Sequence, residues 1–285
     1  MKIFLIGKNG QLAQEIIKES GKQRFKIFAF SKKELDIRNY YAINKAVEKK
    51  NPDFVINTSA YHVTSECELH PDKAFEVNVF AVKNLALICK KNNVKFVTYS
   101  TDYVFDGKKN RPYIEDDQPN PLQIYGLSKY AGEIVSLNYN PDGVVIRTCG
   151  VYGGSEGSPS KKGNFVLNIL KEMKTKNRVE ISADQIISPT YAVDLAKATL
   201  QLIKKKNTNG IYHLINEGYC SWAEFAKKII DLKKINSRII PIDRKGFFEI
   251  NRPLFSALKN SRAAALGIQL PYWKDALEKY LQFLD

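Results

Sequence analysis

The sequence predicts an α/β fold built on a doubly wound parallel sheet with a smaller α/β lobe. Three observations predict it. Continuously apolar runs alternate with amphipathic helical stretches in the first half of the chain, the alternation repeats about every 30 residues, and a glycine turn joins the first run to the first helix. Strands of a parallel sheet are buried on both faces, so their runs lack polar alternation. Because ligands of such sheets bind at the carboxyl ends of the strands, we expect the functional residues there.

The first half supplies the elements of this sheet in chain order. Lys2 to Gly7 is an apolar run that ends in glycine, and Pro71 stands where a helix can begin. A Pro-Asp-Gly turn at residues 141–143 introduces the fifth strand. We expect strands at residues 2–7, 25–30, 53–59, 94–100 and 143–149, and helices at residues 11–20, 41–50, 71–91 and 125–137.

The second half is less regular. Residues 153–163 are rich in Gly, Ser and Lys and predict a mobile loop. Ser221 and Glu224 form a capping box that opens a helix to about residue 232. We further expect strands at 179–183, 210–215 and 237–242, and helices at 165–174, 191–205, near 261 and at 273–284.

These elements predict two lobes. Residues 1–150 with about 183–215 would form a Rossmann-like dinucleotide-binding domain. Residues of about 151–182 and 216–285 would form a substrate-binding lobe over the carboxyl edge of the sheet. The cleft between the lobes is then the expected active site.

Composition indicates an ordinary soluble protein. Of 285 residues, 44% are hydrophobic and 26% charged, and no apolar run approaches the roughly 18 residues that a membrane span needs. We therefore expect a cytoplasmic protein without a membrane partner. The four cysteines form no C-x-x-C pair and lack zinc-ligand spacing, so reduced, buried thiols are expected. The formal charge of +14 comes from lysines dispersed in pairs, which favours a basic soluble surface over nucleic-acid binding.

The glycine turn predicts a dinucleotide site. Gly7-x-x-Gly10-x-x-Ala13 directly follows a strand and opens a helix, and its small residues let a pyrophosphate approach the helix N-terminus. The second strand ends at Ser31, which two lysines follow. An NAD-selective site usually has an acidic residue at this position, so the neutral serine favours NADPH and leaves NADH open.

A Tyr-x-x-x-Lys pair predicts proton transfer. Tyr125 and Lys129 share one face of a helix, although Tyr41 and Lys45 form a second pair of the same spacing. Tyr41 lies in an early helix with no strand end of catalytic character before it, whereas Thr101 ends the fourth strand 24 residues before Tyr125, where its hydroxyl would face the same cleft. A nearby ammonium favours the phenolate and brings the pKa of tyrosine closer to neutrality, which suits a proton donor to a ketone undergoing reduction. The Thr101 hydroxyl would donate to the same substrate oxygen.

These residues, with several further motifs, resemble the dTDP-4-dehydrorhamnose reductase family of the extended short-chain dehydrogenase/reductase superfamily. The motifs occur in order over residues 1 to about 267. They are Gly-x-x-Gly-Gln-Leu at 7–12, Ser-Thr-Asp-Tyr-Val-Phe-Asp-Gly at 100–107, Tyr-Gly-x-Ser-Lys at 125–129 with Gly-Glu at 132–133, Asp-Gln-x-x-Ser-Pro-Thr-Tyr at 184–191, and Arg-Pro-x-x-Ser-x-Leu at 252–258.

The resemblance implies NADPH-dependent reduction of the C4 ketone of a nucleotide-linked 4-keto-6-deoxy sugar, dTDP-4-dehydrorhamnose to dTDP-L-rhamnose above all. It implies Thr101, Tyr125 and Lys129 as catalytic residues. The cofactor residues it implies, Tyr125 and Lys129 among them, include Gly7, Gly10, Gln11, Leu12, Ser31, Asp36, Ile37, Ala60 and Tyr61. The substrate residues would be Val104, Phe105, Gly150 and Arg252. No metal is expected, and a homodimer is left open.

The chain departs from the family pattern at two places. Residues 62–67 read His-Val-Thr-Ser-Glu-Cys where the rhamnose enzymes commonly have Thr-Ala-Val-Asp-Lys-Ala, and Gly150 replaces a tryptophan that packs on the sugar. These departures bear on the choice of sugar and leave two other functions open. One is a sugar-nucleotide epimerase or dehydratase that retains NAD. The other is a binding protein similar to the regulatory subunit of methionine adenosyltransferase.

Overall fold

A six-stranded parallel sheet forms the centre of the protein. We describe its computed structural model over residues 1–158, 162–243 and 250–285; part of the expected 153–163 loop lies outside the described residues. The strands lie in the order β10-β5-β4-β3-β1-β2. The chain therefore adds β2 on one side of β1 and the later strands, from β3 onward, on its other side. The strands are β1 (Lys2–Ile6), β2 (Lys26–Phe30), β3 (Phe54–Asn57), β4 (Lys95–Thr101), β5 (Val144–Thr148) and β10 (Gly210–His213). The predicted doubly wound, Rossmann-like sheet is confirmed.

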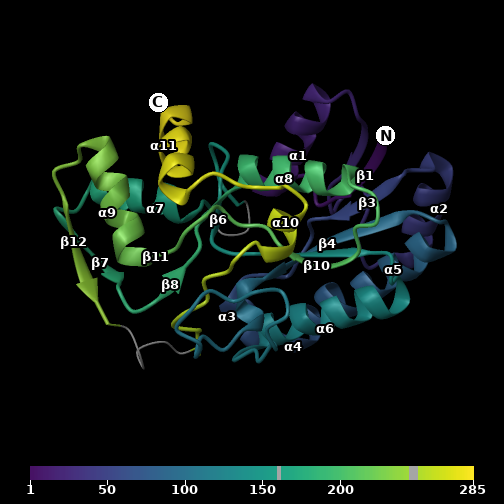
Figure 1. Ribbon diagram of the computed structural model, residues 1–285, viewed down its shortest axis with the longest axis horizontal. Helices are drawn as coiled ribbons and strands as arrows, with labels where there is room; N and C mark the ends of the chain where they lie inside the picture. Colours follow the sequence, from purple (N-terminus) through teal and green to yellow (C-terminus); the bar gives the residue numbers. More distant parts are fainter. Residues whose placement is uncertain (159–161, 244–249) are drawn as a thin grey trace.

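Helices cover both faces of the sheet (Figure 1). The helices α1 (Gln11–Lys22) and α8 (Ala192–Lys204) pack on one face, and α2 (Tyr40–Lys50), α5 (Ala81–Lys91) and α6 (Ile124–Tyr139) pack on the other. Each face has its own apolar core. Ile3, Leu5 and Leu200 belong to the first core, and Phe4 and Leu85 belong to the second.

A smaller lobe lies at one end of the sheet (Figure 1). It consists of α7 (Phe165–Met173), α9 (Trp222–Lys233), α11 (Trp273–Phe283) and the parallel pair β7 (Arg178–Ser182) and β12 (Arg238–Ile242). Its core includes Tyr152, Phe225 and Tyr280. The expected capping box opens α9, since Ser221 Oγ accepts from Glu224 N and the Glu224 carboxylate accepts from Ser221 N. The residue boundaries of the two lobes remain a prediction.

Short elements that the sequence did not predict join lobe and sheet. β6 (Val151–Tyr152) pairs with β9 (Thr190–Tyr191), and β8 (Ile186–Ile187) pairs with β11 (Cys220–Ser221). Two-residue strands are too short to show periodicity, so no pattern could reveal them. The same applies to α3 (Thr64–Leu69), which is only six residues long, whereas α10 (Ser261–Ala265) is the short helix that we expected near residue 261.

The expected single helix over residues 71–91 is interrupted. It consists of α4 (Pro71–Phe75), a π-helical segment η1 (Glu76–Phe80) and α5. Buried Asn78 lies in the π segment, where its amide accepts from Tyr61 N at 3.0 Å and donates to Tyr61 O at 2.8 Å and to Ser128 Oγ at 3.0 Å. Such segments occur often at functional sites. Here it fixes the loop after β3 against α6.

Two glycines let α6 approach the elements beside it. A Cβ added at Gly126 would lie 2.1 Å from Tyr103 O in the short 3₁₀ helix η2 (Asp102–Val104). A Cβ at Gly132 would lie 2.3 Å from Asn78 O. A larger side chain at Gly126 forces α6 away from the segment that follows Thr101 at the end of β4, and one at Gly132 forces it away from the π segment.

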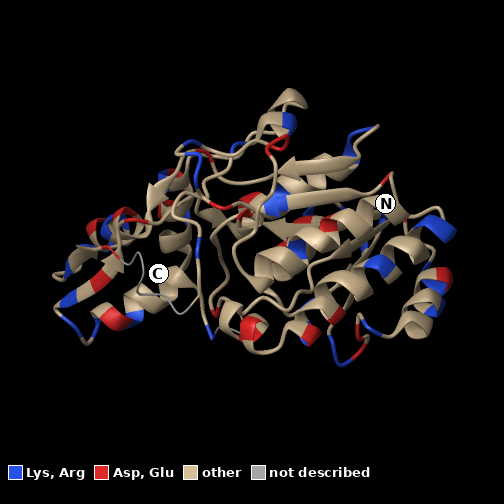
Figure 2. Ribbon diagram, turned by 90° about the horizontal axis from the view of Figure 1, so that it is seen from below, with Lys and Arg blue, Asp and Glu red and all other residues tan. Residues whose placement is uncertain are grey.

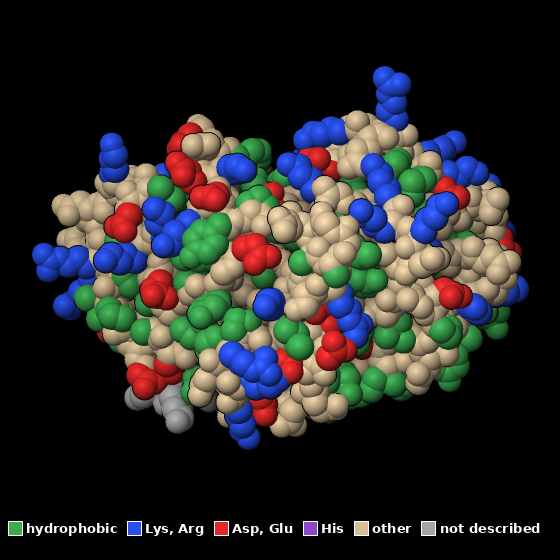
Figure 3. Space-filling view, viewed as in Figure 1, with side chains coloured by type: hydrophobic (Ala, Val, Ile, Leu, Met, Phe, Trp, Pro, Cys, Tyr) green, Lys and Arg blue, Asp and Glu red, His purple; other side chains and the backbone are tan. Residues whose placement is uncertain are grey.

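The basic residues are dispersed, as the sequence predicted. Figure 2 shows lysines and arginines on most of the outer helices, interspersed with acidic residues. On the face seen in Figure 3, the described residues show no single basic patch. Within the described ranges, no helix is both long enough and apolar enough to cross a membrane.

We expect Gly126→Ala to lower the free energy of unfolding by about 1–3 kcal/mol, because the added methyl overlaps Tyr103 O. Gly21→Ala is the matched control: Gly21 is also helical, and a Cβ there meets nothing within 4 Å. The control should be neutral or stabilising by up to about 1 kcal/mol. Urea unfolding monitored by circular dichroism measures both. Equal stabilities of the two variants would contradict the close approach of α6.

Candidate active site

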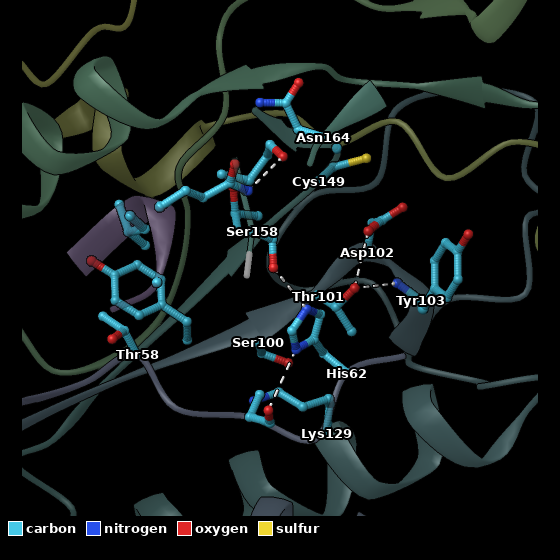
Figure 4. Close-up of a pocket in the computed structure, with 18 of the residues that line it drawn as sticks. Thr58, His62, Ser100, Thr101, Asp102, Tyr103, Lys129, Cys149, Ser158 and Asn164 are labelled. Atoms are coloured by element: carbon cyan, nitrogen blue, oxygen red, sulfur yellow. Dashed lines mark hydrogen bonds between the residues drawn. The ribbon is translucent and has the colours of Figure 1, made fainter. Parts of the chain in front are cut away.

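A cleft of about 350 Å³ lies where the strands end and the lobe begins. The glycine turn, the ends of β3, β4 and β5, and the start of α6 contribute to its walls, and the lobe contributes Asn164, Phe165 and Trp222. In Figure 4, Thr101 lies between Lys129 on one side and Cys149 and Asn164 on the other. Of the predicted site residues, eight line this cleft: Gly10, Gln11, Leu12, Ala60, Thr101, Tyr125, Lys129 and Gly150.

The glycine turn is shaped for a close ligand. Gly7 has a φ of 93°, and a Cβ on it would lie 2.7 Å from Thr58 Oγ1. Gly10 precedes α1 and provides no side-chain cap, so the N-terminal N–H groups of α1 face the cleft without one. Gln11 donates to Val151 O at 2.9 Å, while its buried Oε1 has no hydrogen-bond partner among the residues that the structure describes. An uncapped helix N-terminus and an unpaired amide oxygen fit a dinucleotide pyrophosphate and its ribose hydroxyls.

Thr101, Tyr125 and Lys129 meet in this cleft. Thr101 is the last residue of β4, and Tyr125 and Lys129 lie in the first turns of α6, whose N-terminus Gln123 caps by accepting from Gly126 N. The tyrosine ring packs edge-on against Tyr103, with centroids 6.1 Å apart. Lys129 is buried although it is charged in solution. It is one of the residues that line the cleft.

Burial sets the protonation states of this group. It raises the pKa of Tyr125 above its usual value. It lowers the pKa of Lys129 to about 8, against the attraction of the Glu133 carboxylate. Tyr125 therefore holds its proton at neutral pH, and Lys129 carries a charge that is lost in mildly alkaline solution.

The Thr101 hydroxyl is engaged in the protein itself. We expected it to donate to the substrate oxygen, but it donates to Asp102 Oδ1 at 3.0 Å and accepts from Tyr103 N at 3.2 Å. Asp102 is buried, and its other carboxylate oxygen accepts from Ser256 Oγ at 2.6 Å. Sequence reasoning assigned no role to Asp102 or Ser256, because their contact joins residues 154 positions apart.

The end of β2 differs from the neutral strand end that we predicted. The Ser31 hydroxyl and amide both donate to Glu34, and Lys8 of the glycine turn pairs with the same carboxylate at 2.6 Å. The bonds from Lys8 and Ser31 lower the pKa of Glu34 to about 2. Asp36 is engaged with Arg38, whose guanidinium lowers the pKa of that carboxyl. An acidic group is therefore present at this edge, balanced by Lys8.

The predicted substrate residues divide into three groups. Val104 and Phe105 have fully buried side chains in the core that do not line the cleft, and their assignment to substrate remains a prediction. Gly150 does line it, with a φ of 51°. Arg252 lies beside Tyr103, where its charge opposes the rise that burial causes in the pKa of the phenol.

Trp222 is a cleft residue that the sequence did not point to. It is the first residue of α9, and its ring edge lies 3.6 Å from the Cβ position of Gly150. Its ring packs against Phe165 with centroids 4.3 Å apart. An aromatic surface thus borders the cleft at Gly150, supplied by the lobe. The capping box predicted the helix, but the sequence carried no signal for this contact.

The described residues contain no cluster of three or more His, Cys, Asp or Glu side chains that could hold a metal ion. His62 lines the cleft, where its Nε2 lies 3.5 Å from Ser158 Oγ. Tyr61 lies outside the cleft lining and is held by Asn78. Ser100 and Thr148 also line the cleft, and within the described ranges each has a buried hydroxyl without a hydrogen-bond partner.

Known proteins resemble this chain over nearly all of its residues. The spore coat polysaccharide biosynthesis protein SpsK of Bacillus subtilis is 35% identical over 99% of this chain and 97% of its own length. The dTDP-4-dehydrorhamnose reductase of Aggregatibacter actinomycetemcomitans is 34% identical over 100% of this chain and 99% of its own.

Solved structures agree with these relatives. The dTDP-4-dehydrorhamnose reductase of Bacillus anthracis, crystallised with NADP, has a TM-score of 0.92 at 32% identity and covers 99% of both chains. A UDP-glucose 4-epimerase of Thermus thermophilus has a TM-score of 0.84 at 18% identity over 100% of this chain and 99% of its own, a likeness of fold alone. A family model described as the RmlD substrate binding domain matches residues 1–285. These matches confirm the resemblance seen in the motifs. The chain belongs to the RmlD substrate binding domain family, and it is similar to a dTDP-4-dehydrorhamnose reductase over its whole length.

Proposed function

We propose that this protein is an NADPH-dependent reductase of a nucleotide-linked keto sugar, acting on the C4 ketone of a 4-keto-6-deoxy sugar. One observation carries the proposal: Thr101, Tyr125 and Lys129 line the same cleft as the uncapped glycine turn. A proton donor is thus placed within the same enclosure as a dinucleotide site. The name and the NADP complex of the Bacillus anthracis relative support the cofactor and the reaction class.

Tyr125 is the proton donor in this proposal. Bound NADPH supplies the hydride. Because burial keeps the Tyr125 phenol protonated, it can give its proton to the oxygen that gains charge as the ketone is reduced. Lys129, one helical turn away, stabilises the phenolate that remains. Its burial strengthens this attraction, because a charge in a poorly solvated cleft is weakly screened.

The cofactor preference rests on the edge formed by Lys8, Ser31 and Glu34. Lys8 and the following Lys32 and Lys33 provide positive charge for a 2′-phosphate. The negative charge of Glu34 would repel a 2′-phosphate, but its carboxylate is already bound by Lys8 and Ser31. NADPH is therefore favoured, and NADH remains an alternative.

The substrate that we favour is dTDP-4-dehydrorhamnose, reduced to dTDP-L-rhamnose. The names of several relatives support it, among them those of Aggregatibacter actinomycetemcomitans and Burkholderia thailandensis. SpsK, which is equally similar, is named for a spore coat polysaccharide rather than for one sugar. The reaction class therefore has broader support than the sugar.

A panel assay tests the reaction. Purified protein should oxidise NADPH in the presence of dTDP-4-dehydrorhamnose and more slowly with other 4-keto sugar nucleotides, measured by absorbance at the nicotinamide band. Protein that carries NAD through purification and consumes no NADPH would instead indicate an epimerase. Absence of turnover with every keto sugar would favour a binding protein.

Tyr125→Phe tests the proton donor. Loss of the hydroxyl should lower kcat by roughly 100-fold or more, because general acid catalysis contributes about that much. The Kd for NADPH, measured by fluorescence quenching, should change little. Tyr41→Phe, in the other Tyr-x-x-x-Lys pair, is the control, since Tyr41 is 83% exposed on α2. A Tyr125→Phe enzyme with near-normal turnover would exclude the assigned role.

The pKa of Lys129 predicts the alkaline limit of activity. Because the charged form is required and its pKa is lowered to about 8, kcat should be constant below that pH and fall as the pH rises through it. Lys129→Arg keeps a charge at every accessible pH, so the residual kcat of this variant should not fall as the pH rises through about 8. The measurement is kcat against pH under saturating substrate. If kcat of both proteins falls at the same pH, the decrease belongs to a group other than Lys129.

A further inference from the structure

The buried carboxyl group of Asp102 links a catalytic side chain to the smaller lobe. Asp102 directly follows Thr101 in the chain, and only 3% of it is exposed. Its Oδ1 accepts from Thr101 Oγ1 at 3.0 Å, and its Oδ2 accepts from Ser256 Oγ at 2.6 Å. Figure 4 shows the first of these bonds at the floor of the cleft. A buried carboxylate needs such donors to offset its desolvation.

The number of protons on the Thr101 hydroxyl makes Asp102 decisive for its orientation. A hydroxyl has one proton and two lone pairs, whereas an ionised carboxylate can only accept. The proton of Thr101 goes to Asp102, and one lone pair is taken by Tyr103 N at 3.2 Å. The remaining lone pair is left for a donor in the cleft, which the Tyr125 phenol also lines. Without the carboxylate, the hydroxyl is free to rotate and can turn its proton toward the cleft instead.

Ser256 is held firmly enough to fix that carboxylate. It is fully buried, and its N–H donates to Ile186 O at 2.9 Å. Flanking bonds secure the same segment: Ile186 N donates to Leu254 O at 2.7 Å, and Leu258 N donates to Ser188 Oγ at 3.2 Å. The serine hydroxyl thus reaches Asp102 from a backbone that is fastened on both sides.

We propose that Ser256, acting through Asp102, is a positioning residue for the catalytic Thr101. It holds one oxygen of the carboxylate, so that the other takes the Thr101 proton and leaves one lone pair of the threonine oxygen available to the Tyr125 phenol in the cleft. Turnover then depends on the contact between the lobe segment that carries Ser256 and the end of β4. This inference rests on the proposed reductase function.

Ser256→Ala tests the proposal against a matched control. Ser20→Ala also removes a fully buried serine hydroxyl, but this one lies near the C-terminal end of α1 and has no hydrogen-bond partner among the described residues. We expect Ser256→Ala to lower kcat about tenfold, the loss that corresponds to one hydrogen bond to a charged group, with KM and the Kd for NADPH within about twofold. Ser20→Ala should keep kcat within about twofold, whatever its effect on the unfolding midpoint.

A double-mutant cycle distinguishes positioning from general destabilisation. In a Thr101→Val background, Ser256→Ala should have less than about a twofold further effect, because the group that it positions is gone. Single-turnover hydride transfer with enzyme in excess keeps these slow variants measurable. An equal loss in both backgrounds, or a folded Ser256→Ala protein with normal kcat, would overturn the proposal.

Asp102→Asn carries the same test if Ser256→Ala does not fold. An amide offers one acceptor oxygen in place of two, so it cannot accept from both hydroxyls. The same drop in kcat is expected, again absent in the Thr101→Val background. The wild-type enzyme separates the two claims: an inert wild type would overturn the function together with the inference, whereas an active wild type matched by its variants would overturn the inference alone.

Discussion

The buried ion pair between Glu133 and Arg147 is the interaction on which the active site depends. Arg147 donates to the two carboxylate oxygens at 2.9 and 2.7 Å, and both side chains are at most 2% exposed. The pair joins α6 to β5, and the Phe105 ring lies 5.1 Å from the guanidinium. Removing one partner from such a pair typically costs about 3–5 kcal/mol, because the other is left charged and buried. The geometry of α6, and with it that of Lys129 one turn away, rests on this contact.

Chemistry and packing are joined in the same helix. The Glu133 carboxylate that holds Arg147 also opposes the fall that burial causes in the pKa of Lys129. Gly126 and Gly132 allow α6 to approach η2, which follows β4, and the π segment, so that Tyr125 and Thr101 line the same cleft. The motif at residues 125–133 therefore combines the side chains proposed to react, Tyr125 and Lys129, with two glycines that let α6 pack closely on its neighbours.

The sequence predicted what is periodic or local. The main strands, the long helices and the trio at Thr101, Tyr125 and Lys129 could be found because strand ends and helix starts follow from apolar patterns. The contacts of Asp102 with Ser256 and the place of Trp222 beside Gly150 could not, because both depend on how the lobe packs. Val104 and Phe105 were assigned to substrate by resemblance, yet their motif serves the core. The assignment of site roles, the lobe boundaries and a homodimer remain predictions.

The most direct test of this account follows the hydride. NADPH carrying deuterium at the transferable position of its nicotinamide ring would be reacted with dTDP-4-dehydrorhamnose and the sugar product examined by NMR. The account predicts one deuterium at C4 of the sugar for each NADPH oxidised, and none when Tyr125→Phe replaces the wild type over the same time. A product in which C4 carries only hydrogen, or a sugar converted without NADPH oxidation, would contradict it.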